Sequence, residues 1–271
     1  MWTDTHCHLD AHEFEGQSRA VARRAAQAGV SMIVIPAVER GNFGAVAQLA
    51  AQEPNASYAL GIHPICVPNA REEDLVFLRQ QVEAALADPR FVAIGEIGLD
   101  FFIPMLCEPA MRAKQDHFFR EQLRIARDFA LPVLMHVRRS QDQVLKHVRQ
   151  VRPAGGIAHA FNGSFQQAQI YIDLGFKLGF GGAMTFTRAL QIRRLASQLP
   201  LGAIVLETDA PDIAPAWVHP AINSPEQLPA IGAALAELRG LSIEQVRLAT
   251  QQNAWSALPR LGAITKQGAA S

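Results

Sequence analysis

Cysteines are scarce in this sequence, and they form no paired motif. Cys7, Cys66 and Cys107 are odd in number and far apart, which excludes the framework of a small disulfide-stabilised protein. No apolar run reaches the roughly 18 residues of a membrane-spanning helix. No charged and apolar leader precedes the first predicted strand, at Trp2. We therefore expect a cytoplasmic protein without a membrane partner.

An excess of charge of either sign is also lacking. Lys+Arg and Asp+Glu number 25 each, and only two Tyr and three Trp are present. Proteins that bind long stretches of nucleic acid combine a basic groove with stacking aromatic side chains. The composition therefore argues against an extended nucleic-acid interface, but not against an enzyme that holds a few terminal nucleotides. Hydrophobic residues make up 49% of the 271 residues, which allows a large buried core.

Apolar, β-branched or aromatic runs recur along the whole chain and predict eight strands. They cover residues 1–7, 31–37, 57–64, 91–100, 131–137, 155–161, 176–182 and 203–211. Helical patterns lie between most of them, as at 19–29 and 118–130, and 244–258 predicts a last helix. Strands that alternate with helices indicate a parallel sheet, and continuously apolar strands indicate that both its faces are covered.

Eight such units predict an α/β protein with a single-domain (β/α)8 TIM barrel over residues 1–262. Residues 263–271 are expected to be a frayed C-terminal tail. A doubly wound open sheet is the alternative, although it usually has fewer strands and binds its ligand at a switch point.

The predicted strand ends are rich in histidine and carboxylate side chains, and a TIM barrel collects its chemistry at the C-terminal ends of its strands. Five of the nine histidines and two acidic residues lie there: His6, His8, His63, Glu96, His136, His159 and Asp209. A lone histidine on a strand is usually a hydrogen-bonded core residue, and His117 and His147 are expected on helix surfaces. Residues i and i+2 of a strand face the same side, about 6.5–7 Å apart. His6 and His8 can therefore converge on one ion, while Cys7 points away as a small buried hydrophobe.

The number of candidate ligands indicates two metal ions. With His63 left out, the four other histidines and the two carboxylates give more ligands than the roughly four that one tetrahedral zinc binds. Glu96 is the natural bridging ligand, because its strand lies between the other contributors. Two divalent ions with two carboxylates leave a formal local charge of about +2, so a neutral protein can still hold a phosphate. A mixed histidine and carboxylate site accepts zinc, manganese, iron, cobalt or magnesium, so the identity of the metal stays open.

Several motifs together resemble the TatD family of metal-dependent deoxyribonucleases, within the amidohydrolase-like hydrolases. They are "DTHCHLD" (4–10), "GIHP" (61–64), "IGEIGLDFF" (94–102), "LPVLMHVRRSQD" (131–142), "HAFNGS" (159–164) and "VLETDAP" (205–211). The resemblance implies one metal on His6, His8, Glu96 and Asp209, and a second on Glu96, His136 and His159. It also implies removal of nucleotides from DNA 3′ ends. Two positions depart from the family pattern, since Phe102 stands where Tyr is frequent and Ile222 where a basic residue precedes Asn223.

The remaining roles follow from chemistry. Two metals can hold a water and stabilise the attacking and the leaving oxygen of the hydrolysis. Glu96 would be the ligand that the two metals share. Asp209 would be a ligand, a general base or both. His63 is expected to contact substrate, or alternatively to pack against the Pro64 turn. Arg138 or Arg139 is a candidate phosphate ligand because a guanidinium binds phosphate in a bidentate manner. The alternative for both arginines is a solvated helix start.

These observations predict a divalent-metal-dependent phosphodiesterase, a deoxyribonuclease of the 3′–5′ exonuclease type. Its partners would be DNA ends or a small phosphodiester or ester. The alternative within enzymes is hydrolysis of a small ester, lactone or cyclic amide. A non-catalytic binding module is a third class, against which the complete ligand set argues. The sequence predicts no oligomeric state.

Overall fold

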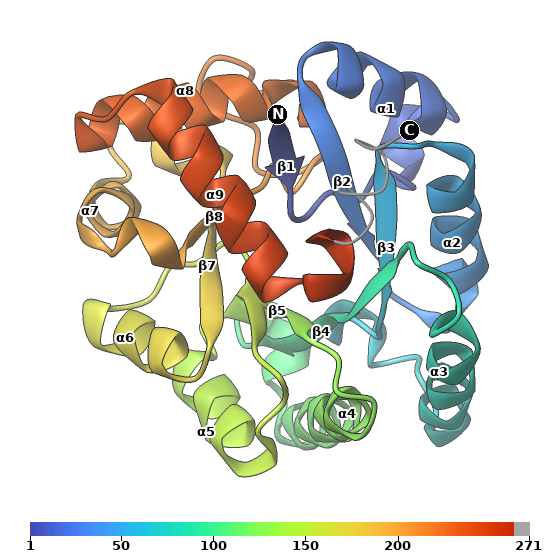
Figure 1. Cartoon of the computed structure of the whole chain (residues 1–271). Coiled ribbons are helices and arrows are strands. Elements are labelled where there is room, and N and C mark those ends of the chain that lie inside the picture. Colours follow the sequence, from blue (N-terminus) through green and yellow to red (C-terminus); the bar gives the residue numbers. More distant parts are fainter. Residues whose placement is uncertain (263–271) are drawn as a thin grey trace.

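Eight parallel strands follow one another around a central axis in chain order, β1 to β8 (Figure 1). The computed structural model describes residues 1–262. The strands are β1 (Trp2–Asp4), β2 (Val30–Pro36), β3 (Ala56–Leu60), β4 (Phe91–Asp100), β5 (Val133–Arg138), β6 (Gly156–Ala158), β7 (Phe176–Phe180) and β8 (Ile204–Leu206). The backbone N–H of Thr5 donates to the Leu206 carbonyl over 3.1 Å and links the last strand to the first. The fold is therefore the predicted (β/α)8 TIM barrel.

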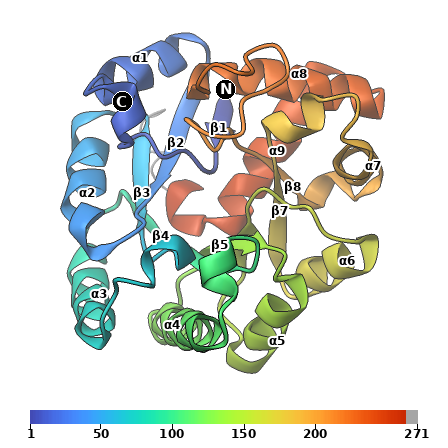
Figure 2. The same cartoon turned by 180° about the vertical axis from the view of Figure 1, so that it is seen from behind.

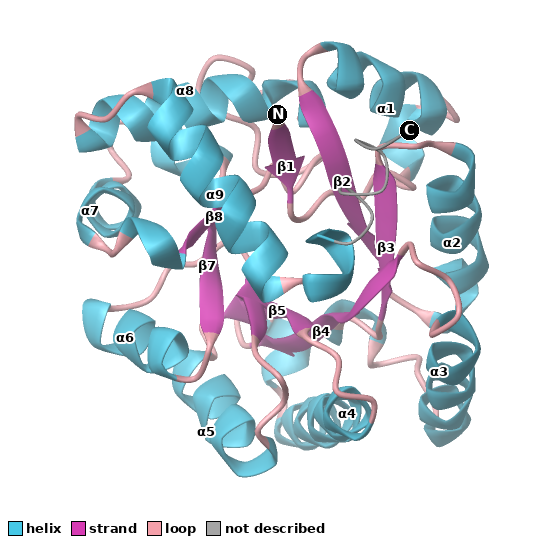
Figure 3. Cartoon of the chain, viewed as in Figure 1, coloured by secondary structure: helices cyan, strands magenta, loops and turns pink. Residues whose placement is uncertain are grey.

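Helices surround the strands in a continuous outer layer (Figure 3). The α-helices are α1 (Ser18–Gln27), α2 (Phe43–Gln52), α3 (Glu72–Ala85), α4 (Pro109–Asp128), α5 (Gln141–Val151), α6 (Phe165–Asp173), α7 (Leu190–Gln198), α8 (Leu228–Arg239) and α9 (Ile243–Ala257). Short 3-10 helices are η1 (His12–Phe14), η2 (Arg40–Asn42), η3 (Pro64–Cys66), η4 (Pro104–Cys107), η5 (Gly182–Thr185), η6 (Leu201–Ala203) and η7 (Pro225–Gln227). Among residues 1–262, no helix has both the length and the apolar character needed to cross a membrane.

The last helix closes one end of the barrel. It crosses in front of the strands in Figure 1 and lies behind them in Figure 2. Ala254, Ala257 and two residues beyond the helix, Leu258 and Leu261, pack with inward side chains of the strands such as Val34. Ser242 caps the N-terminus of this helix. Its hydroxyl accepts the N–H of Gln245, and the Gln245 side chain accepts the N–H of Ser242. This reciprocal cap satisfies two backbone N–H groups at the start of the helix.

Four strands end at least three residues earlier than the sequence predicts, and α4 begins earlier. Strand β1 ends at Asp4, β3 at Leu60, β6 at Ala158 and β8 at Leu206, so His6, His8, His63, His159 and Asp209 lie in loops just past the strands. Backbone hydrogen bonds still hold these loops, for example from the Asp209 N–H to the His6 carbonyl over 2.8 Å. Helix α4 starts at Pro109, because the fixed φ of proline suits the first helical position. The predicted tail, residues 263–271, lies outside the described residues.

Candidate metal centre and substrate pocket

All six predicted metal ligands meet at one end of the barrel. The residues that follow β1, β6 and β8 supply His6, His8, His159 and Asp209, while β4 and β5 carry Glu96 and His136. Most of them line a pocket of about 940 Å³, together with His63, Arg138 and Arg139. The opposite end is closed by α9. The pocket is thus at the end where a TIM barrel places its chemistry.

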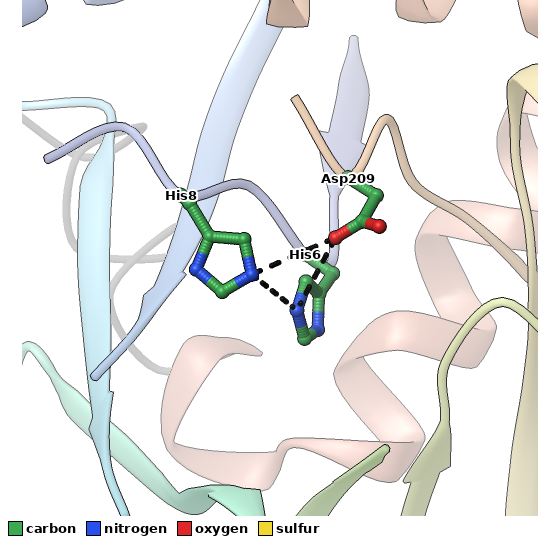
Figure 4. A group of neighbouring side chains, drawn as sticks. All are labelled: His6, His8 and Asp209. Carbon is green, nitrogen blue, oxygen red and sulfur yellow. Dashed lines mark hydrogen bonds and ion pairs between the residues drawn. The ribbon is translucent and has the colours of Figure 1, made fainter. Parts of the chain in front are cut away.

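A first group of three side chains, His6, His8 and Asp209, offers ligand atoms close enough together to hold one ion. The Nε2 atoms of His6 and His8 lie 3.4 Å apart, and each is 3.6 Å from Asp209 Oδ1 (Figure 4). Glu96 Oε2 lies 3.0 Å from His6 Nε2 and 3.4 Å from His8 Nε2. Tetrahedral ligands held at 2.0–2.1 Å from a zinc ion are separated by about 3.4 Å. His6, His8 and Asp209 therefore have spacings that fit a divalent metal, and Glu96 Oε2 lies beside the two histidines of this group.

A second group gathers around the other oxygen of Glu96. Glu96 Oε1 lies 3.1 Å from His136 Nδ1 and 3.0 Å from His159 Nε2. Register between β4 and β5 shifts between Ile94 and Ile97, so Glu96 sits at an irregularity of the ladder. The carboxylate is buried, and each of its oxygens faces different histidines, as a bridging ligand does. Within residues 1–262, however, the ligand atoms close enough to share one ion form the sets His6, Glu96 and His159 and His63, Glu96 and His136, so His136 and His159 are not brought into one set with Glu96.

His63 also faces Glu96 but differs in its hydrogen bonding. Its Nδ1 accepts the N–H of Ile65 over 3.0 Å, and its Nε2 lies 3.4 Å from Glu96 Oε1. Burial lowers the pKa of His63 to about 4, so the ring is neutral at neutral pH. In a neutral ring whose Nδ1 is the acceptor, the proton resides on Nε2. His63 therefore presents an N–H donor, and not a free lone pair, to the pocket.

Two buried carboxylates that the sequence prediction missed support these ligands. Asp100 Oδ2 lies 3.0 Å from His136 Nε2, the ring nitrogen that faces away from Glu96. Asp4 accepts from the Thr208 hydroxyl over 2.6 Å and from the His6 N–H over 3.2 Å, and so ties the loop after β1 to the loop after β8. The spacing in the sequence contained a signal for Asp100, since it lies four residues beyond Glu96 in one strand and such residues share a face.

Burial and neighbouring charges shift the titration of the cluster. Burial lowers the pKa of His6 to about 3 and raises the pKa of Asp209 to about 6. Burial would also raise the pKa of Glu96, but His63, His6 and His159 outweigh it and hold that pKa well below its usual value. Glu96 is thus ionised and His6 is neutral, the protonation states in which both can ligate a metal.

Arg138, the last residue of β5, and Arg139, which follows it, share one aromatic ring at the mouth of the pocket. The guanidinium carbon of Arg138 lies 3.8 Å from the centroid of the Phe102 ring, and that of Arg139 lies 4.6 Å from it. Arg138 Nη1 is 3.9 Å from Asp100 Oδ2. Over residues 1–262, Arg139 has no carboxylate within 4 Å of its guanidinium. Arg139 is therefore the less neutralised of the two.

Three further positions named in the sequence analysis, Ile222, Asn223 and His147, lie outside the group of candidate metal ligands. Ile222 is exposed, whereas Asn223 is buried and donates to the carbonyls of Thr208 and Asp212, which holds the loop after β8. The expectation of a surface position for His147 is wrong, because this side chain is buried with its Nε2 2.8 Å from Asp116 Oδ1. A neighbouring carboxylate, which the helical pattern does not reveal, makes that burial possible.

Comparison with known proteins settles the family. The model of TatD related DNases matches residues 3–258. The chain belongs to the TatD family. It is 39% identical over 254 residues to the Escherichia coli protein called uncharacterized metal-dependent hydrolase YjjV, covering 93% of this chain and 96% of that protein. The crystal structure of E. coli YjjV, a TatD homologue, superposes with a TM-score of 0.89 at 37% identity, over 95% of this chain and 98% of that one.

A more distant relative carries a more specific name. The mouse protein called putative deoxyribonuclease TATDN3 is 28% identical, covering 97% of this chain and 90% of that protein. The family and the close relatives together identify this TatD-family chain as a metal-dependent hydrolase.

Proposed function

We propose that this TatD-family hydrolase is a divalent-metal-dependent phosphodiesterase that removes nucleotides from the 3′ ends of DNA. The observation that carries the proposal is the position of Glu96, whose two oxygens face two separate groups of histidines at 3.0–3.4 Å. Such an arrangement suits two ions that share a carboxylate. The family of TatD related DNases and the mouse relative called a putative deoxyribonuclease support DNA as the substrate.

The proposal assigns the candidate ligands to two ions. His6, His8, Asp209 and one oxygen of Glu96 would hold one, and His136, His159 and the other oxygen of Glu96 would hold the second. When bound, such a pair of ions lowers the pKa of a water and stabilises the attacking and leaving oxygens.

The chain's own residues supply the remaining functions. Asp209 borders the pocket, where its carboxylate can accept a proton from a nucleophilic water. The Nε2–H of His63 can donate to a phosphoryl oxygen. Arg138 and Arg139 present guanidinium groups at the mouth, where they can bind further phosphate oxygens in a bidentate manner.

Charge favours a phosphodiester over a neutral substrate. Two divalent ions and the two carboxylates would leave a formal charge of about +2 in the pocket, and two arginines stand at its mouth. A phosphodiester brings one negative charge to this region, whereas a lactone or cyclic amide brings none. The attraction is larger in a partly dry pocket than in water.

The test is a gel time course with a 5′-labelled single-stranded oligonucleotide and metal-loaded protein. We expect shortening from the 3′ end, no shortening of an oligonucleotide with a blocked 3′ end, and loss of activity in Glu96→Gln. Lactones and cyclic amides are offered to the same preparation. Intact DNA together with turnover of a lactone or cyclic amide would overturn the nuclease assignment.

A further inference from the structure

The mouth of the pocket is divided by charge into two opposite halves. The basic half is formed at the ends of β4 and β5, by Phe102 after β4 and by Arg138 and Arg139 at the end of β5. The acidic half is formed by Asp10 and Glu13 after β1 and by Asp212 after β8. The strands run in chain order around the barrel, and β8 is joined to β1. Strands β4 and β5 therefore lie across the barrel from β1 and β8 (Figure 1). The arginines and the three carboxylates face each other over the candidate metal centre.

The basic half is held in place by contacts within the protein. Both guanidinium groups stack on the one Phe102 ring, at 3.8 and 4.6 Å from its centroid. Cation–π contacts of this kind orient the cations without using their N–H groups. Phe102 itself remains 44% exposed, so an incoming molecule can reach the arginines and the edge of the ring. This half is a preformed surface for phosphate oxygens.

The acidic half has no lysine or arginine side chain in the lining of the pocket. Within residues 1–262, the lysine and arginine side chains that line the pocket are Arg138 and Arg139. Asp212 and Glu13 are exposed, and Asp10 accepts one hydrogen bond from the amide of Asn42 over 2.9 Å. Glu13 lies 3.2 Å from the exposed His12, but a phosphate placed on this half would meet three carboxylates and no lysine or arginine of the pocket lining. Hydroxyl groups and base amino groups, in contrast, can donate hydrogen bonds to these carboxylates.

We propose that these two halves set the direction in which a strand end lies in the pocket. The phosphates of the strand run out over Phe102, Arg138 and Arg139, and the terminal nucleotide lies against Asp10, Glu13 and Asp212. The outer end of that nucleotide carries a hydroxyl group and no phosphate. This proposal rests on the proposed phosphodiesterase function, and it makes the enzyme selective for unphosphorylated ends.

The first experiment compares two oligonucleotides of one sequence, ending in a 3′-hydroxyl or a 3′-phosphate, with metal-loaded protein. We expect the 3′-phosphate end to be removed at least tenfold more slowly. The double variant Asp10→Asn and Asp212→Asn should reduce that ratio several-fold. Glu83→Gln, an exposed carboxylate on α3 away from the pocket, should leave the ratio as it is. Equal rates for the two ends in the unaltered protein would overturn the proposal.

The second experiment tests the basic half with Phe102→Leu and Phe102→Tyr. KM for a single-stranded tetranucleotide should rise at least fivefold in Phe102→Leu and much less in Phe102→Tyr, which keeps the ring. Bis(p-nitrophenyl) phosphate has no neighbouring phosphates, so its KM should rise less than that of the tetranucleotide. An equal rise for both substrates in Phe102→Leu would contradict a role for this half in holding the strand.

A binding measurement separates this proposal from the proposed function. Fluorescence anisotropy measures how tightly the metal-loaded protein binds labelled oligonucleotides. The last linkage of each oligonucleotide is a phosphorothioate, which is hydrolysed slowly. Tighter binding of the 3′-hydroxyl form, and weaker binding by Phe102→Leu, support the directional mouth even if no DNA is hydrolysed, in which case only the nuclease function fails. Hydrolysis of DNA without any preference between the two ends, in binding or in rate, overturns the directional mouth alone.

Discussion

The imidazole of His136 is held between two carboxylates, with Nδ1 3.1 Å from Glu96 and Nε2 3.0 Å from Asp100. The contact to Asp100 leaves Nδ1 as the nitrogen directed at the candidate metal site. Carboxylates that hold the far nitrogen of a ligating histidine fix its tautomer and its orientation, and their removal typically costs 10–100-fold in metal affinity or activity. Asp100 is therefore a positioning residue for this ligand.

Asp100→Asn should weaken the ion on His136 and His159 about 10–100-fold and the ion on His6 and His8 much less. Competition with a chelator, followed by elemental analysis, measures both affinities. Asp116→Asn is the matched control. Asp116 Oδ1 lies 2.8 Å from His147 Nε2, and neither residue lines the pocket. Equal losses in the two variants would remove the assigned role of Asp100.

Metal content tests the shared carboxylate directly. Protein prepared without chelator and then reloaded should bind two divalent ions per chain. Glu96→Gln should weaken both, because its oxygens face both groups, whereas Asp209→Asn should weaken one, because Asp209 Oδ1 lies 3.6 Å from both His6 and His8. A saturating value of one ion in the unaltered protein would exclude the bridged arrangement. Thermal unfolding of each variant checks that the barrel is intact.

The two arginines should not contribute equally to hydrolysis of DNA. Arg138 is already near Asp100, at 3.9 Å, so more of its charge is neutralised than that of Arg139. Arg139→Lys keeps the charge but loses the planar fork, and we expect it to slow cleavage about tenfold, or roughly 1.4 kcal/mol of barrier. Arg138→Lys should have the smaller effect in the same single-turnover assay, and the reverse order would contradict this ranking.

Stability should depend on pH through Glu53, which is 1% exposed and lies 2.7 Å from Arg19 and 3.3 Å from Arg23. Burial would raise its pKa, but the two arginines outweigh burial and hold the pKa below its usual value. A carboxylate with a lowered pKa stabilises the fold above its unfolded-state pKa, and this stabilisation is lost as the pH falls through its folded-state pKa.

Glu53→Gln should lower the free energy of unfolding at pH 7 by about 1–2 kcal/mol, since both arginines are half exposed and water screens them. The difference from the unaltered protein should shrink below about pH 4. Urea unfolding at pH 7 and pH 3.5 measures it. A difference that stays constant over this range would mean that packing, and not charge, accounts for the loss.

The sequence predicted the strands well and the surroundings of the site less well. Strands such as β2 are apolar throughout because both faces of a parallel sheet are covered, so the fold could be read from apolar runs. The convergence of His6, His8 and Asp209 followed from the barrel geometry. The support of Asp100 and Asp4, and the stacking of both arginines on Phe102, depend on contacts between residues far apart in the chain, which periodicity does not encode.

The position of α9 has a consequence for how the chain is made. Residues 1–242 contain every candidate metal ligand and the eight strands, whereas α9 and the residues after it, up to Leu261, pack against the apolar end of the barrel. While these last residues are still inside the ribosome, the nascent chain already contains all its candidate ligands. The apolar end of its barrel is then exposed to water. A chain that ended before Ile243 should therefore expose this apolar end to water and aggregate, although its set of candidate ligands would be complete.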